Sequence, residues 1–381
     1  MTRKLATITK VRETFPIEGA DFIEAVTMTT NGWVCVAKKG DFALGDFGVY
    51  FEIDSFLPKE ERYAFLDGRS NKTMNDVEGY RLKTVKLRKQ ISQGLLLPLP
   101  QFPEIIDPHE GDDVTELLKI ELYEPPVKTS THSGQFQIAG KFPSFVRKTD
   151  QERIQSFNES QIKTFEDKTY EITEKLDGTS ATYYYKNKHF GVCSRNLEIK
   201  TPFSKTFLQH CLEWFQKKFL HRWFKKQSGS SKSKSKSIYE EIALLHNLDK
   251  TLPALCEETG HNYAVQGEIV GTNISNNRLK LDNADFYVFD VFDIDKQTYI
   301  DASERYAIAE RLKLPHVPII ETEHVLRFDE TPIKQMIKSA DGKSTLSDKK
   351  REGIVYKQRG SEPWAISFKI ISNEYLLEHG L

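Results

Sequence analysis

Cysteine is scarce in this sequence, and the spacing of the few cysteines indicates no shared site. Cys35, Cys193, Cys211 and Cys256 lie far apart, and no Cys-x-x-Cys pair occurs among the 381 residues. This spacing excludes the usual zinc-finger pattern and a disulfide-rich secreted scaffold. It is typical of reduced thiols in a reducing compartment, so we expect an intracellular protein.

Long hydrophobic runs and an excess of charge are also missing. No stretch approaches the roughly 20 apolar residues that a membrane-spanning helix needs. The first ten residues, MTRKLATITK, have no signal-peptide core. With 54 basic and 55 acidic residues, the net charge is only −1. We therefore expect no membrane partner, and any nucleic-acid site must be a local basic patch.

The first part of the chain has the pattern of a small β-barrel. Apolar and polar residues alternate in short runs that glycines separate, which is typical of half-buried strands. The runs that fit best are 5–11, 22–27, 33–37, 48–53 and 95–99, with 81–87 as a further possibility. So many short strands within 1–120 indicate a barrel, and an OB-fold is the commonest small barrel of this kind.

Basic residues cluster in one of these runs. Within 80–89, Arg81 and Lys83 alternate, and Lys86 and Arg88 follow. Cations along one strand edge can track a phosphate backbone, so Lys83, Lys86 and Arg88 are candidate nucleic-acid ligands. The same pattern also fits a solvated edge on which lysines discourage pairing with another chain.

A shift in composition divides the chain. Residues 121–140, ELYEPPVKTSTHSGQFQIAG, are rich in Pro, Ser, Thr and Gly and predict a linker between a barrel domain over 1–120 and a second domain over 141–381. In the second domain, 203–227 carries apolar residues at helical spacing. The segment 228–237, SGSSKSKSKS, predicts a disordered loop whose lysines either make loose phosphate contacts or have no role.

The most informative stretch is 170–180, YEITEKLDGTS. It predicts a strand that ends in a turn at Gly178, and Lys175 and Asp177 would share one face of the extended chain. A lysine amine beside a carboxylate, next to a glycine that lets backbone approach, suits attack on a phosphate. Alone, Lys-x-Asp-Gly is a weak signal, because it also fits an exposed turn after an edge strand.

Further short motifs follow in order. They are Ser194-Arg195-Asn196, Gly267-Glu268, Phe289-Asp290-Val291, Glu352-Gly-Ile-Val-Tyr-Lys357 and Ser367-Phe-Lys369. Strand patterns at 263–270, 286–292, 353–357 and 364–371 place most of them in a largely β domain with helices. Each motif alone has an ordinary structural explanation, but all of them in this order indicate one site.

The acidic members of these motifs explain how the lysine would become reactive. A lysine amine is mostly protonated at neutral pH and is then a poor nucleophile. A divalent cation beside it would favour the neutral amine and also neutralise phosphate charge. Mg²⁺ prefers oxygen ligands, so Asp177, Glu268 and Glu352 are candidate metal ligands, directly or through water.

The basic and aromatic members suit a nucleotide. Arg195, Lys357 and Lys369 suit the charge that develops on an α-phosphate. Phe289 can stack on adenine. Arg153, upstream of the nucleophile, is a further candidate phosphate ligand, although an isolated arginine often forms only a surface ion pair.

In this order the motifs match those of the covalent nucleotidyltransferases, and the whole chain resembles the ATP-dependent RNA ligases of the Deinococcus/Naegleria type. The runs 40–54, 142–155 and 367–377 are similar to that branch in particular. DNA ligases and capping enzymes usually place an OB domain after the last motif, whereas only twelve residues follow Lys369 here. The β-rich module lies in front, as in this RNA ligase branch.

The resemblance implies an α+β fold: an N-terminal OB-like β-barrel, then a nucleotidyltransferase (ATP-grasp-like ligase) domain of antiparallel sheets with flanking helices. It implies ATP and Mg²⁺ or Mn²⁺ as cofactors. Lys175 would form lysyl-AMP, and Asp177, Glu268 and Glu352 would organise the metal. The implied nucleotide contacts are Arg153, Glu174, Arg195, Glu268, Phe289, Lys357 and Lys369.

One departure from the family pattern concerns the last motif. Lys357 and Lys369 would act on the α-phosphate together with Lys175. Related enzymes often carry paired lysines in the last motif, but Ser367 occupies the first of those positions here. Lys369 is therefore the expected α-phosphate ligand of this motif, and a mechanism that uses two lysines there is not expected.

The expected reaction joins 3′-OH and 5′-phosphate ends in a nicked RNA or RNA/DNA duplex, with RNA on the 3′-OH side, and the expected state is a monomer. The nearest alternative is an ATP-dependent DNA ligase of unusual layout. A capping enzyme would use GTP and usually needs a C-terminal OB domain. A non-catalytic nucleic-acid-binding relative would not need an intact lysine and three carboxylates.

Overall fold

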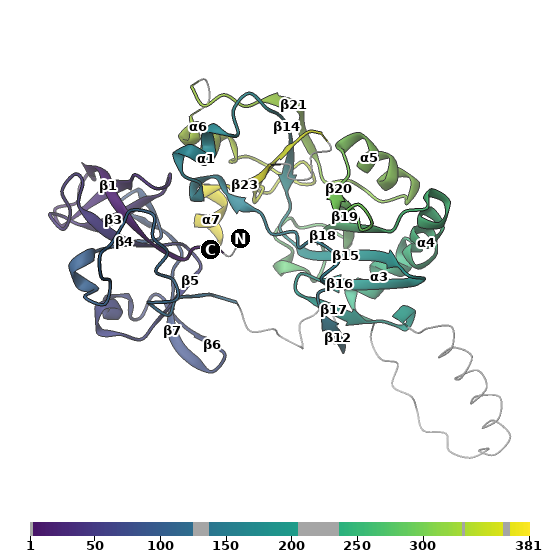
Figure 1. Ribbon diagram of the computed structural model, residues 1–381, viewed down its shortest axis with the longest axis horizontal. Coiled ribbons are helices and arrows are strands. Elements are labelled where there is room, and N and C mark those ends of the chain that lie inside the picture. The colour runs from purple at the N-terminus through teal and green to yellow at the C-terminus, as the bar shows by residue number, and fades with distance from the viewer. Residues whose placement is uncertain (1–2, 125–136, 205–235, 330–331, 361–365) are drawn as a thin grey trace, which may run out of the picture.

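The computed structural model describes residues 3–124, 137–204, 236–329, 332–360 and 366–381. These residues form an N-terminal β-barrel and a larger part that is built on two sheets with helices (Figure 1). No helix in the described ranges is long and apolar enough to cross a membrane.

Two antiparallel sheets and a hairpin make up the barrel. The sheets have the strand orders β10-β4-β1-β2-β3 and β11-β5-β7-β6, and β8 pairs with β9. The bounds are Ala6–Pro16 (β1), Ile23–Met28 (β2), Val34–Lys38 (β3), Phe47–Phe51 (β4), Ser55–Pro58 (β5), Asn71–Met74 (β6), Val77–Arg81 (β7), Thr84–Leu87 (β8), Gln90–Gln93 (β9), Leu95–Pro98 (β10) and Glu121–Leu122 (β11).

The strand β1 curves the first sheet. Its first half pairs with β4 and its second half with β2, and the register shifts between Val11 and Glu13. A bulge of this kind bends a strand and helps a sheet to close. Ile8, Val49 and Phe51 are fully buried, so the alternation in the sequence becomes the barrel core.

The larger part contains a seven-stranded sheet, β12-β17-β16-β15-β18-β19-β20, and a five-stranded sheet, β13-β23-β22-β14-β21. The strand pairs of both sheets are antiparallel, except β13 with β23. The bounds are Gln137–Lys141 (β12), Glu152–Arg153 (β13), Thr169–Lys175 (β14), Thr179–Lys186 (β15), His189–Ser194 (β16), Leu197–Lys200 (β17), Tyr263–Val270 (β18), Asp285–Asp293 (β19), Thr298–Tyr299 (β20), Ile319–Val325 (β21), Gly353–Gln358 (β22) and Ser367–Ile371 (β23).

Helices pack against both sheets. Their bounds are Glu159–Lys163 (α1), Ile238–Leu245 (α3), Leu248–Thr259 (α4), Ala302–Arg311 (α5), Ile333–Ser339 (α6) and Asn373–His379 (α7). Ile242 of α3 and Leu252 of α4 enter the core of the seven-stranded sheet, and Met336 of α6 enters that of the five-stranded sheet. Ser237 and Glu240 form a capping box that fixes the start of α3.

Several contacts join the barrel to the larger part, and two of them involve backbone carbonyls of the larger part. At the first, the amide of Gly32 donates to the carbonyl of Gln155 (3.0 Å). At the second, Lys83 Nζ donates to the carbonyl of Gly380 (2.9 Å), just after α7, and β8 packs against α7. The yellow helix α7 lies between the barrel and the sheets (Figure 1). This last helix is therefore shared by both parts.

Most expected strands are present, with bounds that differ by a few residues. The five best barrel runs correspond to β1 to β4 and β10, and the runs 263–270 and 286–292 correspond to β18 and β19. The segment 81–87 is not one strand, because β7 ends at Arg81 and β8 begins at Thr84. Between them the chain leaves one sheet for a separate hairpin, a change that alternation alone does not reveal.

Both ends of the expected linker form strands. β11 pairs with β5, and β12 pairs with β17, while 125–136 lies outside the described residues. Most of the expected helix 203–227 and the loop residues 228–235 also lie outside them, but Ser237, the last residue of that loop, is buried and caps α3. Polar segments can pair where a neighbouring strand offers an edge, which composition does not show.

Gly94, between β9 and β10, provides a test of barrel packing. Its φ is +92°, and a Cβ there would come within 2.4 Å of the Phe51 carbonyl oxygen. Gly94→Ala should lower the free energy of unfolding by more than about 2 kcal/mol, because the clash adds to left-handed strain. Gly19 has φ +72° with nothing within 4 Å, so Gly19→Ala measures the strain alone. Equal losses in chemical denaturation would contradict the clash.

Candidate active site

Most of the predicted site residues meet in a cavity between the two sheets of the larger part. The cavity holds about 330 Å³ and receives side chains from both sheets. The predicted residues that line it are Glu174, Lys175, Arg195, Glu268, Phe289, Lys357 and Lys369.

Lys175 is the last residue of β14, where it pairs with Gly353 of β22. The following turn brings Gly178 against β18, and a Cβ on Gly178 would come within 2.1 Å of the Ile269 carbonyl oxygen. Only glycine fits there. The strand β14 ends at Lys175, two residues before Asp177, and the shared face of the two side chains stays a prediction. The turn sends the two side chains to different partners.

The amine of Lys175 is paired with a carboxylate. Its Nζ donates to Glu352 Oε2 at 2.7 Å. Burial lowers the pKa of Lys175, but Glu352 and Glu268 raise it more, so the net pKa is above its usual value. The amine is held as an ammonium ion, and it can become a nucleophile only when other positive charge reaches these carboxylates.

For Glu268, in contrast, the surroundings disfavour the charged form. Burial raises its pKa, Lys175 lowers it, and Glu352 and Asp177 raise it again, which brings the pKa to about 8. Three carboxylates thus act on one lysine in a partly buried place. Carboxylate oxygens are the donors that Mg²⁺ and Mn²⁺ prefer, so the set fits a divalent cation whose charge would relieve this repulsion.

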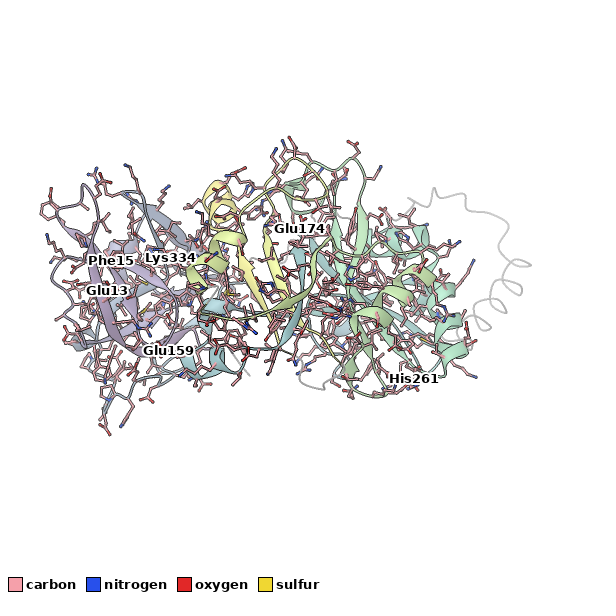
Figure 2. The ribbon with its side chains drawn as sticks, turned by 90° about the horizontal axis from the view of Figure 1, so that it is seen from above. Glu13, Phe15, Glu159, Glu174, His261 and Lys334 are labelled. Atoms are coloured by element: carbon pink, nitrogen blue, oxygen red, sulfur yellow. The ribbon has the colours of Figure 1, made fainter. Side chains whose placement is uncertain are left out.

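A tighter acidic group lies elsewhere. Ligand atoms of His261, Asp293 and Asp295 lie within 4.8 Å of one another, at the end of the molecule far from the barrel (Figure 2). Asp295 accepts from both nitrogens of Asn262, and Asp293 Oδ1 accepts from the amides of Asp295 and Lys296. These bonds cap the β19–β20 turn. In the described part of the chain no such tight group surrounds Lys175.

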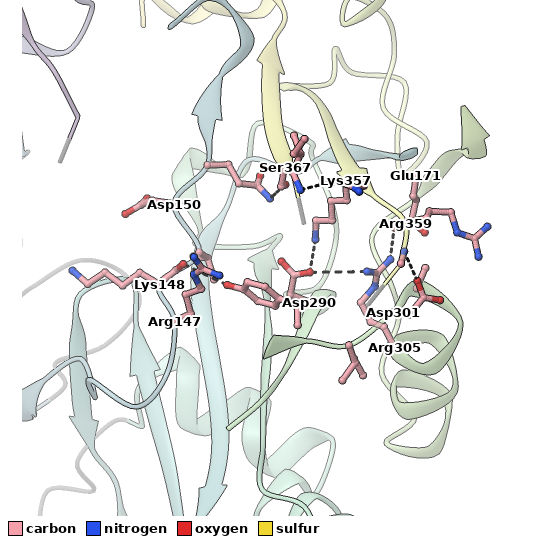
Figure 3. A pocket seen from close by; sticks show the side chains of 18 of the residues that line it. Arg147, Lys148, Asp150, Glu171, Asp290, Asp301, Arg305, Lys357, Arg359 and Ser367 are labelled. Carbon is pink, nitrogen blue, oxygen red and sulfur yellow. Dashed lines mark hydrogen bonds and ion pairs between the residues drawn. The ribbon is translucent and has the colours of Figure 1, made fainter. Parts of the chain in front are cut away.

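Lys357 lines this cavity and also a neighbouring one of about 270 Å³, which Figure 3 shows. Its amine lies 2.7 Å from Asp290 Oδ1 and donates to the carbonyl of Phe289. Asp290 is also 4.0 Å from Arg305, which bonds to Glu171. Burial lowers the pKa of Lys357, Asp290 raises it and Arg305 lowers it, with a net pKa below the usual value. A buried network of paired charges therefore holds this cation.

Lys369 of β23 reaches the same cavity without a paired lysine. Burial lowers its pKa to about 7, and the cations Lys175 and Arg153 act in the same direction. Ser367 stands two residues earlier and accepts a hydrogen bond from Gln151 Nε2 at 2.7 Å. This position therefore contributes hydrogen bonding and no charge.

Two predicted nucleotide ligands, Arg195 and Glu174, line the cavity and bond to other protein groups. Arg195 is largely exposed and bonds to Asp150 Oδ1 at 2.7 Å. Glu174 is buried, and its carboxylate accepts from the amide of Thr345 (2.8 Å) and the hydroxyl of Ser344. Glu174 therefore fixes the segment 344–345 beside the cavity.

Arg153 lies under the barrel and is not among the cavity-lining residues. Its guanidinium is 4.0 Å from Asp54 Oδ2 and 5.8 Å from the centre of the Trp33 ring, and both are barrel residues. The side chain is 12% exposed, and within the described residues its Nη1 has no hydrogen-bond partner. In this arrangement Arg153 joins the barrel to the active-site strand β13 and does not face the cavity.

The predicted nucleic-acid ligands of the barrel fall into two groups. Lys86 and Arg88 are exposed on the β8–β9 hairpin, whereas the amine of Lys83 is engaged by Gly380. The hairpin turn consists of Arg88 and Lys89, both with positive φ (47° and 71°). Lys86 and Arg88 thus remain accessible to a phosphate backbone, and Lys83 takes part in the contact between the two parts of the molecule.

Sequence reasoning missed the partners of two motif residues. Asp177 Oδ2 accepts from Arg278 Nη1 at 2.8 Å and from the Tyr375 hydroxyl at 2.6 Å. Tyr375 lies in the C-terminal run that resembles the RNA ligase branch, which was the one available signal, and Arg278 lies in an asparagine-rich loop without a motif. Asp290 stands in the Phe-Asp-Val motif, but only the fold reveals its pairing with Lys357.

Comparison with family models gives an OB-fold domain over residues 5–99 and an RNA ligase over 168–371. Comparison with curated proteins gives no match. Among solved structures, Naegleria gruberi RNA ligase with pyrophosphate is 38% identical, with 100% of this chain and 99% of that chain covered and a TM-score of 0.80. A lysine-to-methionine variant of that enzyme with AMP and Mn is 38% identical over 99% of both chains, with a TM-score of 0.81. A glutamate-to-alanine variant with ATP and Mn is 37% identical over 100% of both, with a TM-score of 0.80. The predicted fold class, with the barrel first, is confirmed.

The raised pKa of Glu268 makes stability depend on pH. Because the folded-state pKa lies above that of the unfolded chain, stability falls as pH rises from 4.5 toward about 8. Glu268→Gln should exceed the parent in free energy of unfolding by a margin that grows over this range, up to about 3 kcal/mol. Denaturation at pH 5 and pH 8 without divalent ions checks this, and added Mn²⁺ should shrink the margin. A margin independent of pH would show that Glu268 does not carry this strain.

Proposed function

This chain belongs to the RNA ligase family, and on that premise we propose that it joins 3′-OH and 5′-phosphate ends of nucleic acid through a lysyl-AMP intermediate on Lys175. It is an ATP-dependent RNA ligase, and the ATP, AMP and Mn bound by the Naegleria structures support ATP as cosubstrate and a divalent cation as cofactor. The observation that carries the proposal is the pairing of Lys175 Nζ with Glu352 at 2.7 Å, beside a cavity that Glu268, Lys357 and Lys369 line.

In the first step, the neutral amine of Lys175 attacks the α-phosphorus of ATP. A nitrogen–phosphorus bond forms, the bond from the α-phosphorus to the bridging oxygen breaks, and pyrophosphate leaves. Glu352 is the carboxylate within hydrogen-bond reach of the amine and is suited to receive its proton. When bound, a divalent cation supplies positive charge against the carboxylates and the phosphates. Lys357 and Lys369 would stabilise charge on the α-phosphate.

The later steps transfer AMP and join the ends. An oxygen of the 5′-phosphate attacks the phosphorus of lysyl-AMP, the nitrogen–phosphorus bond breaks, and Lys175 regains a proton. The 3′-OH then loses its proton and attacks the 5′-phosphorus, a phosphodiester forms, and AMP leaves. Lys369, with a pKa of about 7, can carry or release a proton near neutral pH, which suits a group beside a phosphate that changes charge.

The proposed substrate is a nick in a duplex with RNA on the 3′-OH side. The exposed Lys86 and Arg88 on the barrel hairpin support a contact with the duplex backbone. We assign 1–120 to a barrel that holds nucleic acid and 141–381 to adenylyl transfer, joined through 121–140. Nicked duplexes that differ only in ribose or deoxyribose at the 3′-OH end test the preference, and equal sealing of both would contradict it.

Lys175→Ala should abolish covalent labelling, because Lys175 is the cavity lysine of the Lys-x-Asp-Gly motif and the one whose amine is paired with Glu352. The measurement is incubation with labelled ATP and divalent cation, followed by a denaturing gel, with labelled GTP as the comparison nucleotide. The parent should be labelled by ATP and not by GTP. A pre-adenylylated nick bypasses this step, so the variant should still seal it to some extent. A labelled Lys175→Ala protein would remove Lys175 from the role of nucleophile.

Removing the hairpin cations should weaken substrate binding without affecting labelling. The double variant Lys86→Gln with Arg88→Gln should bind nicked duplex less tightly and reduce the salt-dependence slope by about two units, one for each lost phosphate contact. Lys188→Gln with Lys313→Gln is the matched control, since both are exposed cations outside the barrel. Binding titrations at several salt concentrations compare the two pairs. Equal slopes for parent and hairpin variant would place the duplex elsewhere.

A further inference from the structure

The carboxylate of Asp177 is anchored on one side. Its Oδ2 accepts from Arg278 Nη1 (2.8 Å) and from the Tyr375 hydroxyl (2.6 Å), and the two donors are 3.3 Å apart. Tyr375 is 1% exposed, so water does not compete freely for this oxygen. A carboxylate with one oxygen held by two donors has little freedom to rotate.

The loop between β18 and β19 delivers Arg278. Ser275, Asn276 and Asn277 just before it have positive φ values of 43°, 61° and 46°, an unusual run for residues other than glycine. The hydroxyl of Ser275 donates to the carbonyl of Gly178 at 2.8 Å, which ties the loop to the turn that carries Asp177. The loop therefore has a defined shape against the motif, and an irregular backbone of this kind is often found where a side chain has to be placed.

The helix α7 delivers Tyr375 and is fixed at both ends. At its start, the hydroxyl of Ser372 donates to Asp341 Oδ1 (2.6 Å) within the larger part. At its end, the carbonyl of Gly380 accepts from Lys83 of the barrel (2.9 Å). The position of Tyr375 thus depends on both parts of the molecule.

We propose that Arg278 and Tyr375 are positioning residues for Asp177: they hold one carboxylate oxygen so that the other keeps a constant direction beside Lys175 and Glu268. The inference rests on the proposed function, in which Asp177 helps to organise a divalent cation. Groups that orient a metal ligand typically change metal affinity by 10- to 100-fold when they are removed. Arg278 and Tyr375 therefore influence the affinity of the site for its cation. Because α7 carries Tyr375 and contacts the barrel, this affinity also depends on the position of the barrel.

Tyr375→Phe tests the proposal because it removes only the hydroxyl. The Mn²⁺ concentration for half-maximal self-adenylylation should rise about tenfold, with a rate close to that of the parent at saturating Mn²⁺. Without ATP, the Mn²⁺-induced rise in Tm should need a correspondingly higher Mn²⁺ concentration. Arg278→Lys keeps the charge but loses the fork of donors, and it should shift both measurements in the same direction.

Tyr170→Phe is the matched control. It also removes a buried hydroxyl of the larger part, one that donates to the carbonyl of Phe165 at 2.9 Å and has no part in the site. Its Mn²⁺ requirement should equal that of the parent. An unchanged Mn²⁺ requirement for Tyr375→Phe and Arg278→Lys, or a loss that saturating Mn²⁺ does not restore, overturns the proposal. Absence of ATP labelling in the parent would instead overturn the proposed function.

A separate variant tests whether the contact between the barrel and α7 influences Asp177. Lys83→Met removes the bond to Gly380 and leaves the neighbours of Asp177 in place. A smaller rise in the Mn²⁺ requirement, in the same direction as for Tyr375→Phe, is expected. An unchanged requirement in both measurements would show that the barrel does not influence Asp177.

Discussion

The excess of partly buried carboxylate charge around one amine is the constraint on which the rest of the site depends. Glu352 binds the amine of Lys175 directly, and Glu268 is left with a pKa of about 8. Such an arrangement is unfavourable until a cation joins it, and the lysine stays protonated until then. The same repulsion between carboxylates would favour the binding of a divalent ion at this place. Lys357 does not relieve the strain, because Asp290 already holds its amine.

The barrel is part of the geometry of the active site and not only an added module. Its Asp54 and Trp33 lie beside Arg153, whose strand β13 pairs with the strand that carries Lys369. Its second contact is with α7, which leads to Asp177. The first contact therefore lies beside the strand that carries Lys369, and the second reaches Asp177 through Tyr375 of α7.

Local sequence patterns predicted the main barrel strands and several residues that line the cavity. They did not predict which residues pair with the site residues. Period-two alternation predicted the main barrel strands. The motifs predicted one site for Lys175, Glu268 and Lys369, and all three line one cavity. The partners of Asp177 lie 101 and 198 residues away in the sequence, and spacing carries no information about such contacts. Arg153 looked like a phosphate ligand because its strand leads to the nucleophile, yet its side chain lies at the barrel interface.

At the tip of the β8–β9 hairpin, the backbone conformation favours other residues than the two cations that occupy the turn. Two-residue turns with positive φ at both positions favour asparagine and glycine, and a larger side chain in this region is disfavoured by roughly 1 kcal/mol or more. Arg88 and Lys89 occupy both positions. An Asn-Gly turn would make a firmer hairpin and would remove two positive charges from its most exposed point. Replacing this turn to raise the thermal stability of the protein would therefore remove two cations. The present residues supply these charges although their backbone conformation is strained.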